Sequence, residues 1–425
     1  MTLVPALCLT GALPGGTAAA ADAGPGAYAF TPGAPTVAGA TGTAQAPRLD
    51  PGRTYRSSLP RNGRLYYRLD LTDATATAYV PVTAVPSADA TVSATDGIRV
   101  SVRDAHGTAC SYGSARFGAA LSPRPVTALA ERDADKGLCR GAGTYYVLVE
   151  REDSGASAGA AREQDWDLEI APATEPRLAG AGAGTAPGAW DSATPAPLAG
   201  EPRDRSGGSG FAAARPLGQG VWRTTLVPGR TQFYKVPLDW GRRVQASAEL
   251  DASPGHGYVG GAVNLALYNP VRGHVEDASL GYTGTRKAVA LAPLPPVEYA
   301  NRNAVPAGVT SMRFAGDYYL VLHLSERMAG VFGRGPFGVT LRVRVDGRAH
   351  AGPDYAGRPV PDGVFTVTAR DREAALTGDT GGGSPMKLLA AGGIGLGTAL
   401  LLVLGGWTLA ARRAQTRVSA QKPTA

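Results

Sequence analysis

The amino-acid sequence predicts an all-β protein made of two tandem, jelly-roll-like antiparallel β-sandwich domains, followed by one C-terminal transmembrane helix. Short segments in which apolar and polar residues alternate predict the strands, and no long segment between the two ends has a helical period. Two stretches of the chain repeat each other, which predicts two domains of one kind. An uncharged run from Leu388 to Ala411 predicts the helix.

Alternation with a period of two identifies most strands. From Tyr67 to Leu71, for example, apolar residues alternate with charged ones, so one face of the strand enters a core and the other meets water. Residues 143–149 and 316–322 each begin Gly-x-Tyr-Tyr and are apolar at consecutive positions. This second pattern predicts strands that are covered on both faces.

The internal repeat is built from segments that occur in the same order in both halves of the chain. The paired segments match at apolar and aromatic positions, and the first two pairs share one offset. A shared order of this kind indicates tandem domains with one fold. The pairs are Tyr55-Arg-Ser-Ser-Leu59 with Trp222-Arg-Thr-Thr-Leu226, Tyr66-Tyr-Arg-Leu-Asp-Leu71 with Phe233-Tyr-Lys-Val-Pro-Leu238, Ile98-Arg-Val-Ser-Val-Arg-Asp104 with Val263-Asn-Leu-Ala-Leu-Tyr-Asn269, Ala142-Gly-Thr-Tyr-Tyr-Val-Leu-Val149 with Ala315-Gly-Asp-Tyr-Tyr-Leu-Val-Leu322, and Trp166-Asp-Leu-Glu-Ile170 with Phe337-Gly-Val-Thr-Leu341.

Composition divides the chain further. Segments that are rich in Ala, Gly, Pro and Thr, with few large apolar residues, cannot bury a core, so we expect them to be disordered or flexible. The remaining parts have the size of ordinary domains. The expected organisation is a signal peptide (1–21), a disordered segment (22–46), a first sandwich (47–172), a flexible linker (173–210), a second sandwich (211–370), a stalk (371–387), a transmembrane helix (388–411) and a cytoplasmic tail (412–425).

Both ends of the chain predict a cell-surface protein. Residues 3–13 form a short apolar run, and the small residues at 17–21 suit signal-peptidase cleavage. No basic residue precedes this run, so either the start codon is placed too late or the signal is weak. Residues 388–411 are long enough to cross a hydrocarbon core of roughly 30 Å. The basic residues that follow, from Arg412 on, place the tail in the cytoplasm and the N-terminal body outside the cell.

Composition and charge narrow the class of protein. The chain has 58 Gly and 33 Pro, and most of its 42 basic residues are Arg, a usage typical of a GC-rich genome and most consistent with an actinobacterium. The net charge of +7 includes the basic tail. No basic cluster with interleaved aromatic residues is present, so we expect no nucleic-acid partner.

Cys110 and Cys139 are the cysteines that remain after removal of the signal. Two cysteines in an exported domain predict one disulfide, which would stabilise the first domain by roughly 3 kcal/mol in the chain-entropy model. A zinc site is the poorer interpretation, because two thiols without a nearby pair of histidines do not complete its ligand set.

Motifs recur in a fixed order in each unit: aromatic-x-x-x-Leu, then Gly with (Phe/Tyr)-Tyr after two or three further residues, then (Val/Leu)-x-(Val/Leu)-x-(Asp/Asn), then Ala-Gly-x-Tyr-Tyr. This order resembles that of bacterial pre-peptidase C-terminal domains. The second unit is the more similar, with Ala214-Arg-Pro-Leu217, Val227-Pro-Gly229 and Leu238-Asp-Trp-Gly241 at family positions, whereas residues 72–79 of the first lack the usual Gly. The resemblance implies a jelly-roll-like sandwich that serves as an accessory, binding or secretion-related module, and some related domains bind calcium.

The sequence contains no motif for catalysis or for a cofactor. Its five histidines fit no His-Glu-x-x-His pattern, and neither a Gly-x-Ser-x-Gly elbow nor a phosphate-binding loop occurs. Asp133 and Asp135 precede Gly137 as at the start of a calcium loop, but its further oxygen ligands are missing. A solvated turn is the better interpretation of this segment and calcium the weaker one. We expect no enzyme activity, no cofactor and no metal site.

The loop Leu291–Ser311 is the largest difference between the two units, and long loops on a shared scaffold often carry binding. Within it, Tyr299, Asn301 and Arg302 have side chains that could bind a carboxylate or sugar hydroxyls. Arg302 is the first residue to substitute in a binding test, because its guanidinium forms directional hydrogen bonds. An ordinary proline-rich excursion is the alternative interpretation.

Aromatic residues of the second unit are a further candidate for binding. Trp240, with Tyr258, Tyr268 and Tyr282, would stack on sugar rings if these side chains lie in a row on one face. The alternative is that they form the rim of the core, as is common in small sandwiches.

Together these observations predict a single-pass cell-surface protein, anchored in the bilayer by residues 388–411. Its ectodomain is expected to be a non-catalytic binding or scaffolding module with an envelope protein or a glycan as its partner. The alternatives are an accessory subunit of a surface enzyme or secretion system, a divergent hydrolase, and a glycan-binding surface protein.

Overall fold

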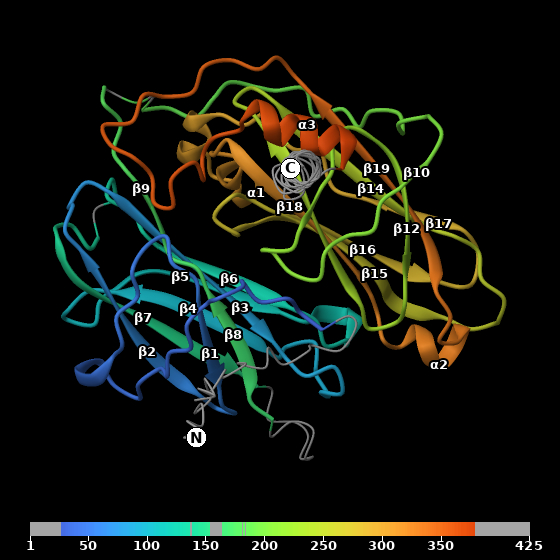
Figure 1. The fold of residues 1–425 in the computed structure, drawn as a ribbon, viewed down its shortest axis with the longest axis horizontal. Helices are drawn as coiled ribbons and strands as arrows, with labels where there is room; N and C mark the ends of the chain where they lie inside the picture. The colour runs from blue at the N-terminus through green and yellow to red at the C-terminus, as the bar shows by residue number, and fades with distance from the viewer. Residues whose placement is uncertain (1–26, 137, 154–163, 181, 183, 379–425) are drawn as a thin grey trace, which may run out of the picture.

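The computed structural model describes residues 27–136, 138–153, 164–180, 182 and 184–378. Within these residues the chain forms two β-sandwiches whose strands pair almost entirely antiparallel (Figure 1). The prediction of an all-β fold built from antiparallel sandwiches is therefore confirmed. The predicted signal peptide and membrane helix lie outside the described residues. No helix among the described residues is long and apolar enough to cross a membrane.

The first sandwich has two sheets. Its elements are η1 (Thr43–Gln45), β1 (Tyr55–Leu59), β2 (Arg64–Leu71), β3 (Thr77–Val85), β4 (Gly97–Arg103), β5 (Ala109–Arg116), η2 (Gly118–Ala120), β6 (Val126–Arg132), β7 (Gly143–Glu152), β8 (Trp166–Ile170) and β9 (Ala173–Glu175). One sheet has the strand order β1-β8-β3-β6, with β9 also paired to β3, and the other has the order β2-β7-β4-β5.

The second sandwich also has two sheets, with short helices at its ends. Its elements are β10 (Arg203–Asp204), β11 (Arg215–Pro216), β12 (Gly220–Leu226), β13 (Thr231–Leu238), β14 (Arg243–Leu250), β15 (Val259–Tyr268), β16 (His274–Tyr282), β17 (Lys287–Ala290), η4 (Tyr299–Asn303), α1 (Ala307–Ser311), β18 (Gly316–Leu324), α2 (Met328–Phe332), β19 (Phe337–Asp346) and α3 (Ala369–Thr377). The sheets have the orders β10-β12-β19-β14-β17 and β11-β13-β18-β15-β16.

The two sandwiches share one topology, as the sequence repeat predicts. Replacing β1, β8, β3 and β6 by β12, β19, β14 and β17 reproduces the order of the first sheet. Replacing β2, β7, β4 and β5 by β13, β18, β15 and β16 reproduces the second. The aligned aromatic residues also take equivalent places, since Tyr55 pairs with Ile170 and Trp222 pairs with Leu341 across the corresponding strands.

The similarity continues N-terminally of the aligned segments. In the first sandwich Thr36 and Arg48 form parallel bridges to Arg56 in β1 and Arg68 in β2. The equivalent contacts in the second sandwich are the parallel pairings of β10 with β12 and of β11 with β13. Residues 22–46 were expected to be disordered, but from residue 27 on they run along the sandwiches. The sheet edges supply hydrogen-bond partners for this backbone, so the segment needs no core of its own.

Alternating burial builds each core. Every second residue of β2, from Leu65 to Leu71, is buried while its neighbours are less so. In β18, by contrast, consecutive residues are buried from Leu320 to Leu324, which confirms the prediction of a strand covered on both faces. The cover of its outer face is the first sandwich.

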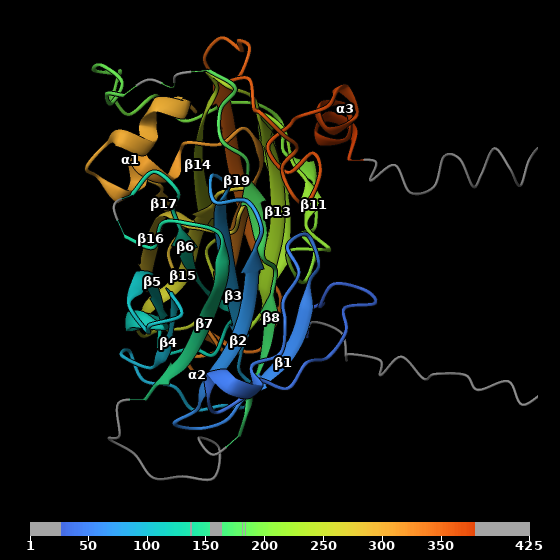
Figure 2. The same cartoon turned by 90° about the vertical axis from the view of Figure 1, so that its left-hand side faces the viewer.

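The two sandwiches pack together through the outer faces of β3, β6 and β8 on one side and of β13, β15 and β18 on the other (Figure 2). Among the residues that the structure describes, three ion pairs cross the interface, and each joins a glutamate of the N-terminal part to an arginine of the second sandwich. The pairs are Glu169 with Arg272, Glu175 with Arg302, and Glu131 with Arg313.

The segments expected to be a flexible linker and a stalk also make contacts. Thr174 in β9 and Leu178 just after it form bridges to Val360 and Tyr355, so the start of the expected linker is paired with the chain that follows β19. In the stalk region α3 packs against β11 and β13. Its N-terminus has a capping box between Thr368 and Asp371, which stabilises this short helix.

Candidate functional site

Arg302 of the predicted binding loop lies at the interface between the sandwiches. Its Nη2 atom is 2.8 Å from Oε1 of Glu175, and its guanidinium lies 3.3 Å from the ring centre of Tyr299. Tyr355 donates a second hydrogen bond to Glu175. Both charges are largely buried, with 15% of the Arg302 side chain and 2% of the Glu175 side chain exposed. The partners of Arg302 are thus internal.

Asn301 stabilises the same loop through hydrogen bonds to its backbone. It is fully buried, and its side-chain nitrogen donates to the carbonyl oxygens of Pro296 and Met312 at 2.8 and 2.7 Å. Tyr299 is half-buried beneath Arg302. The structure thus brings together Tyr299 and Arg302 in an interdomain contact, and it places Asn301 inside the loop.

The four aromatic residues of the second unit do not form a row. Trp240 is 8% exposed and Tyr282 is fully buried, and both belong to the core of the second sandwich. Tyr268 packs against Phe211. Tyr258 is the exposed member of the set. The rim-of-core interpretation therefore describes these side chains better than a sugar-binding platform.

Cys110 and Cys139 form the predicted disulfide, with a Cα–Cα distance of 5.5 Å. Arg132 and Tyr145 hold the second cysteine in place by donating to the carbonyl oxygens of Cys139 and Gly141. The disulfide therefore anchors the turn between β6 and β7 to the start of β5.

The carboxylate of Asp133 in the predicted turn makes local contacts. Asp133 accepts a hydrogen bond from the backbone N–H of Asp135 and lies 3.5 Å from Lys136. No group of three potential metal-ligating side chains occurs among the described residues.

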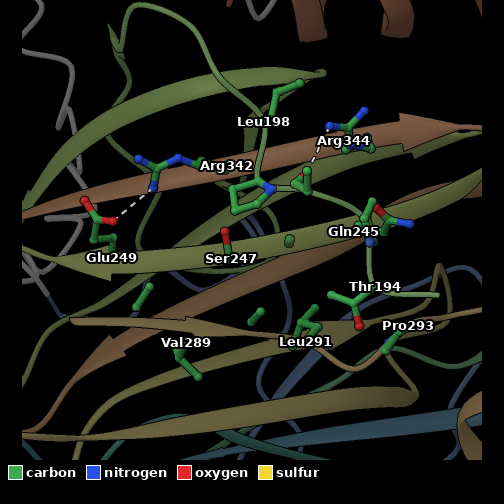
Figure 3. Close-up of a pocket in the computed structure, with 16 residues that line it drawn as sticks. Thr194, Leu198, Gln245, Ser247, Glu249, Val289, Leu291, Pro293, Arg342 and Arg344 are labelled. Atoms are coloured by element: carbon green, nitrogen blue, oxygen red, sulfur yellow. Dashed lines mark hydrogen bonds and ion pairs between the residues drawn. The ribbon is translucent and has the colours of Figure 1, made fainter. Parts of the chain in front are cut away.

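A groove of about 350 Å³ lies on the outer face of the sheet that contains β14, β17 and β19 (Figure 3). One wall is the segment Thr194–Leu198, which we call the strap. Arg344 of β19 fixes the strap by donating to the carbonyl oxygen of Ala196 at 3.1 Å. Pro195 and Pro197 favour an extended backbone in the strap.

Strand alternation and register explain which side chains reach the groove. Gln245, Ser247 and Glu249 are alternate residues of β14 and therefore share one face. Across the strands, Gln245 lies opposite Arg344, and Ser247 lies between Ala290 and Arg342. Small side chains on β17 beside long ones on β14 and β19 leave this face hollow.

The amide of Gln245 is the unusual feature of the groove. Its Oε1 and Nε2 atoms are both buried, and neither has a hydrogen-bond partner among the described residues. An unpaired buried polar group costs about 1–3 kcal/mol, and buried amides are normally satisfied. At the other end of the groove Arg342 contacts Glu249 at 3.5 Å (Figure 3).

Sequence reasoning did not find this groove. The alternation of residues 243–250 places Gln245 on the outer face of a strand, where a glutamine is an ordinary surface residue. The strap, almost fifty positions earlier in the chain, lines the groove beside it, and the amide atoms of this partly buried residue are themselves buried. The chain offers no local signal for that long-range contact.

Comparisons with known proteins do not assign a family. No protein-family model and no curated protein matches the chain. Among solved structures, the CUB1-EGF-CUB2 domain of human MASP-1/3 is 9% identical with a TM-score of 0.18, covering 68% of this chain and 99% of that one. The N-terminal CBM22-1-CBM22-2 tandem domain of Paenibacillus barcinonensis Xyn10C is 12% identical with a TM-score of 0.18, covering 66% of this chain and 82% of that one. The ANXUR2 extracellular domain of Arabidopsis thaliana is 8% identical with a TM-score of 0.17, covering 69% of this chain and 85% of that one. TM-scores this low carry no argument about function.

Proposed function

We propose that this protein is a single-pass cell-surface protein whose ectodomain is a non-catalytic binding or scaffolding module, and that its ligand binds in the groove beside the strap. The Cys110–Cys139 disulfide supports an extracytoplasmic location, because disulfides persist in oxidising compartments. The signal-like N-terminus and the uncharged run 388–411 with its basic flank support the topology.

The observation that carries the binding site is the unpaired amide of Gln245. A buried donor and acceptor without partners beside a groove reduce the stability of the free protein, and a ligand that pairs with both when the side chain turns into the groove removes this cost. The lining otherwise consists mainly of small and apolar groups, with Arg342, Arg344 and Glu249 as its charged residues. Apolar walls with a few placed polar groups are typical of ligand sites.

The packing of the two sandwiches supports a scaffolding role. The glutamates of the three interdomain ion pairs are at most 15% exposed, so they fix one sandwich against the other. A rigid body presents its binding face without an ordering cost. The motifs that resemble pre-peptidase C-terminal domains support an accessory binding module, and this resemblance rests on the motifs alone.

Site-specific photo-crosslinking in the native cells tests the proposal. Ser247 in the groove is replaced by p-benzoylphenylalanine, and Arg223, an exposed residue of the same sheet outside the groove, is the matched control position. We expect a discrete adduct after irradiation at position 247 only, and its loss when Gln245→Leu is added. Equal adducts at both positions, or none at position 247, would contradict the proposed site.

The location is tested separately on intact protoplasts. Added protease should degrade the body of the protein and spare a tag placed after Ala425. A protected body with a digested tag would reverse the topology.

A further inference from the structure

We infer that the ligand of the groove is an extended acidic peptide segment, whose main chain pairs with Gln245 and whose carboxylate binds Arg344. This inference rests on the proposed function and names the ligand class for the same site. Two facts about neighbouring side chains carry it: the unpaired amide of Gln245 and the uncompensated charge of Arg344.

The unpaired amide selects a partner with both a donor and an acceptor. The carbonyl oxygen and the amide nitrogen of Gln245 are buried without a partner, and when the side chain turns into the groove they match the N–H and C=O groups of a peptide unit. The strap shows that this face already binds main chain, since Arg344 donates to the carbonyl oxygen of Ala196. The groove lining contains no aromatic side chain on which a sugar ring could stack.

The charge of the groove selects an anion. Arg342 and Arg344 provide two positive charges, and Glu249, which contacts Arg342, provides one negative charge. Arg344 has only a neutral acceptor in the strap, and no carboxylate among the described residues lies within ion-pair distance of it. Because Gln245 and Arg344 are cross-strand neighbours, one ligand residue can reach both. A guanidinium and a carboxylate form strong, directional hydrogen bonds.

The shape of the groove selects an extended chain with small side chains. Ala288 and Ala290 lie along one side and the prolines of the strap along the other. The volume of about 350 Å³ holds a few residues of an extended peptide rather than a folded element. Proline and alanine on either side of an acidic residue therefore fit the walls best.

Fluorescence anisotropy of the full chain with synthetic peptides tests the inference. The probe is a labelled alanine–proline peptide with one central glutamate, compared with the same peptide carrying glutamine or lysine at that place. We expect the glutamate peptide to bind about tenfold more tightly than the glutamine peptide, and the lysine peptide to bind worst. Equal binding of all three peptides, or binding of none, would overturn the inference.

Variants link the result to the two residues. Gln245→Leu should abolish binding of the glutamate peptide, and Arg344→Gln should remove the preference for glutamate over glutamine. Arg223→Gln, on the same sheet outside the groove, should change neither. If no peptide binds while the crosslink at position 247 persists in cells, the peptide ligand is wrong and the site stands. If the peptide binds equally to Gln245→Leu, the proposed site itself is wrong.

Discussion

Arg302 of the second sandwich lies 2.8 Å from Glu175, which precedes it by 127 positions and ends β9 of the first. This pair joins the two sandwiches at one end of their interface. The ion pair between Glu169 and Arg272 joins the sandwiches at another point of the interface. There the hydroxyl of Tyr28 also donates a hydrogen bond to Glu169. Burial, together with the charge of Glu169, raises the pKa of Tyr28 well above its usual range, so its hydroxyl remains a donor.

Replacing Arg302 by alanine should destabilise the protein. The change leaves Glu175 buried without its ion pair, and breaking such a pair costs about 3 kcal/mol. Arg286→Ala is the control, because 66% of this side chain is exposed and its loss should cost under about 0.5 kcal/mol. Chemical denaturation of both variants measures the difference. Equal stabilities would show that the interdomain pair contributes little.

The sequence was sufficient to predict most of the fold. Alternation located the strands, the repeat predicted two sandwiches of one topology, and two cysteines in an exported unit predicted the disulfide. These signals are local or depend on one chain segment matching another. Residues 36–48 were missed because a segment rich in Ala, Gly and Pro has no periodicity, although sheet edges can still bind its backbone.

The candidate site was less predictable from the sequence, because it also depends on contacts that leave no periodic pattern in the chain. Arg302 has the chemistry of a ligand-binding residue, but its partner Glu175 belongs to a segment that composition predicts to be a flexible linker. Gln245 has the pattern of a surface residue, but its amide atoms are buried in a groove that the strap helps to form. Both outcomes depend on contacts between segments that are distant in the sequence.

Replacing Gln245 by leucine should stabilise the free protein. The change removes an unpaired buried amide and adds apolar surface, so we expect a gain of about 1 kcal/mol in the free energy of unfolding. Gln232→Leu is the matched control, because its Oε1 atom accepts hydrogen bonds from Thr224 and Tyr234. This control should lose about 1 kcal/mol or more. Denaturation curves that move in the same direction for both variants would contradict the assignment.

The stability of the protein should fall in mild acid through His323. Its ring bonds to Thr231 and, across the interface, to Ser122. Burial, and then the positive charge of Arg124, lowers the pKa of His323 to about 3. The unfolded chain, with a pKa near 6.5, therefore binds the extra proton first, and stability decreases as the pH falls from about 6.5 towards 3.

Denaturation at pH 7.5 and pH 5 measures this effect. A His323→Gln variant cannot titrate at this position, so it should lose less stability than the parent over the same interval. A parent and variant with the same loss would show that other groups cause it.

Removing the disulfide should weaken the first sandwich. The bond joins residues 29 positions apart, and the double variant Cys110→Ser, Cys139→Ser should lose roughly 3 kcal/mol in the chain-entropy model. Non-reducing peptide mapping should recover the two cysteines in one linked fragment. Free thiols in the exported protein, or an unchanged midpoint of unfolding for the double variant, would contradict this prediction.

Hydrogen–deuterium exchange of the full chain, with and without the glutamate peptide, tests most directly whether the groove is the binding site. We expect slower exchange in the strap and in β14 and β17, with no change in η4 or in the first sandwich. Protection of the loop Leu291–Ser311 around Arg302, with the strap and β17 unchanged, would contradict the account and place binding at the interdomain loop instead.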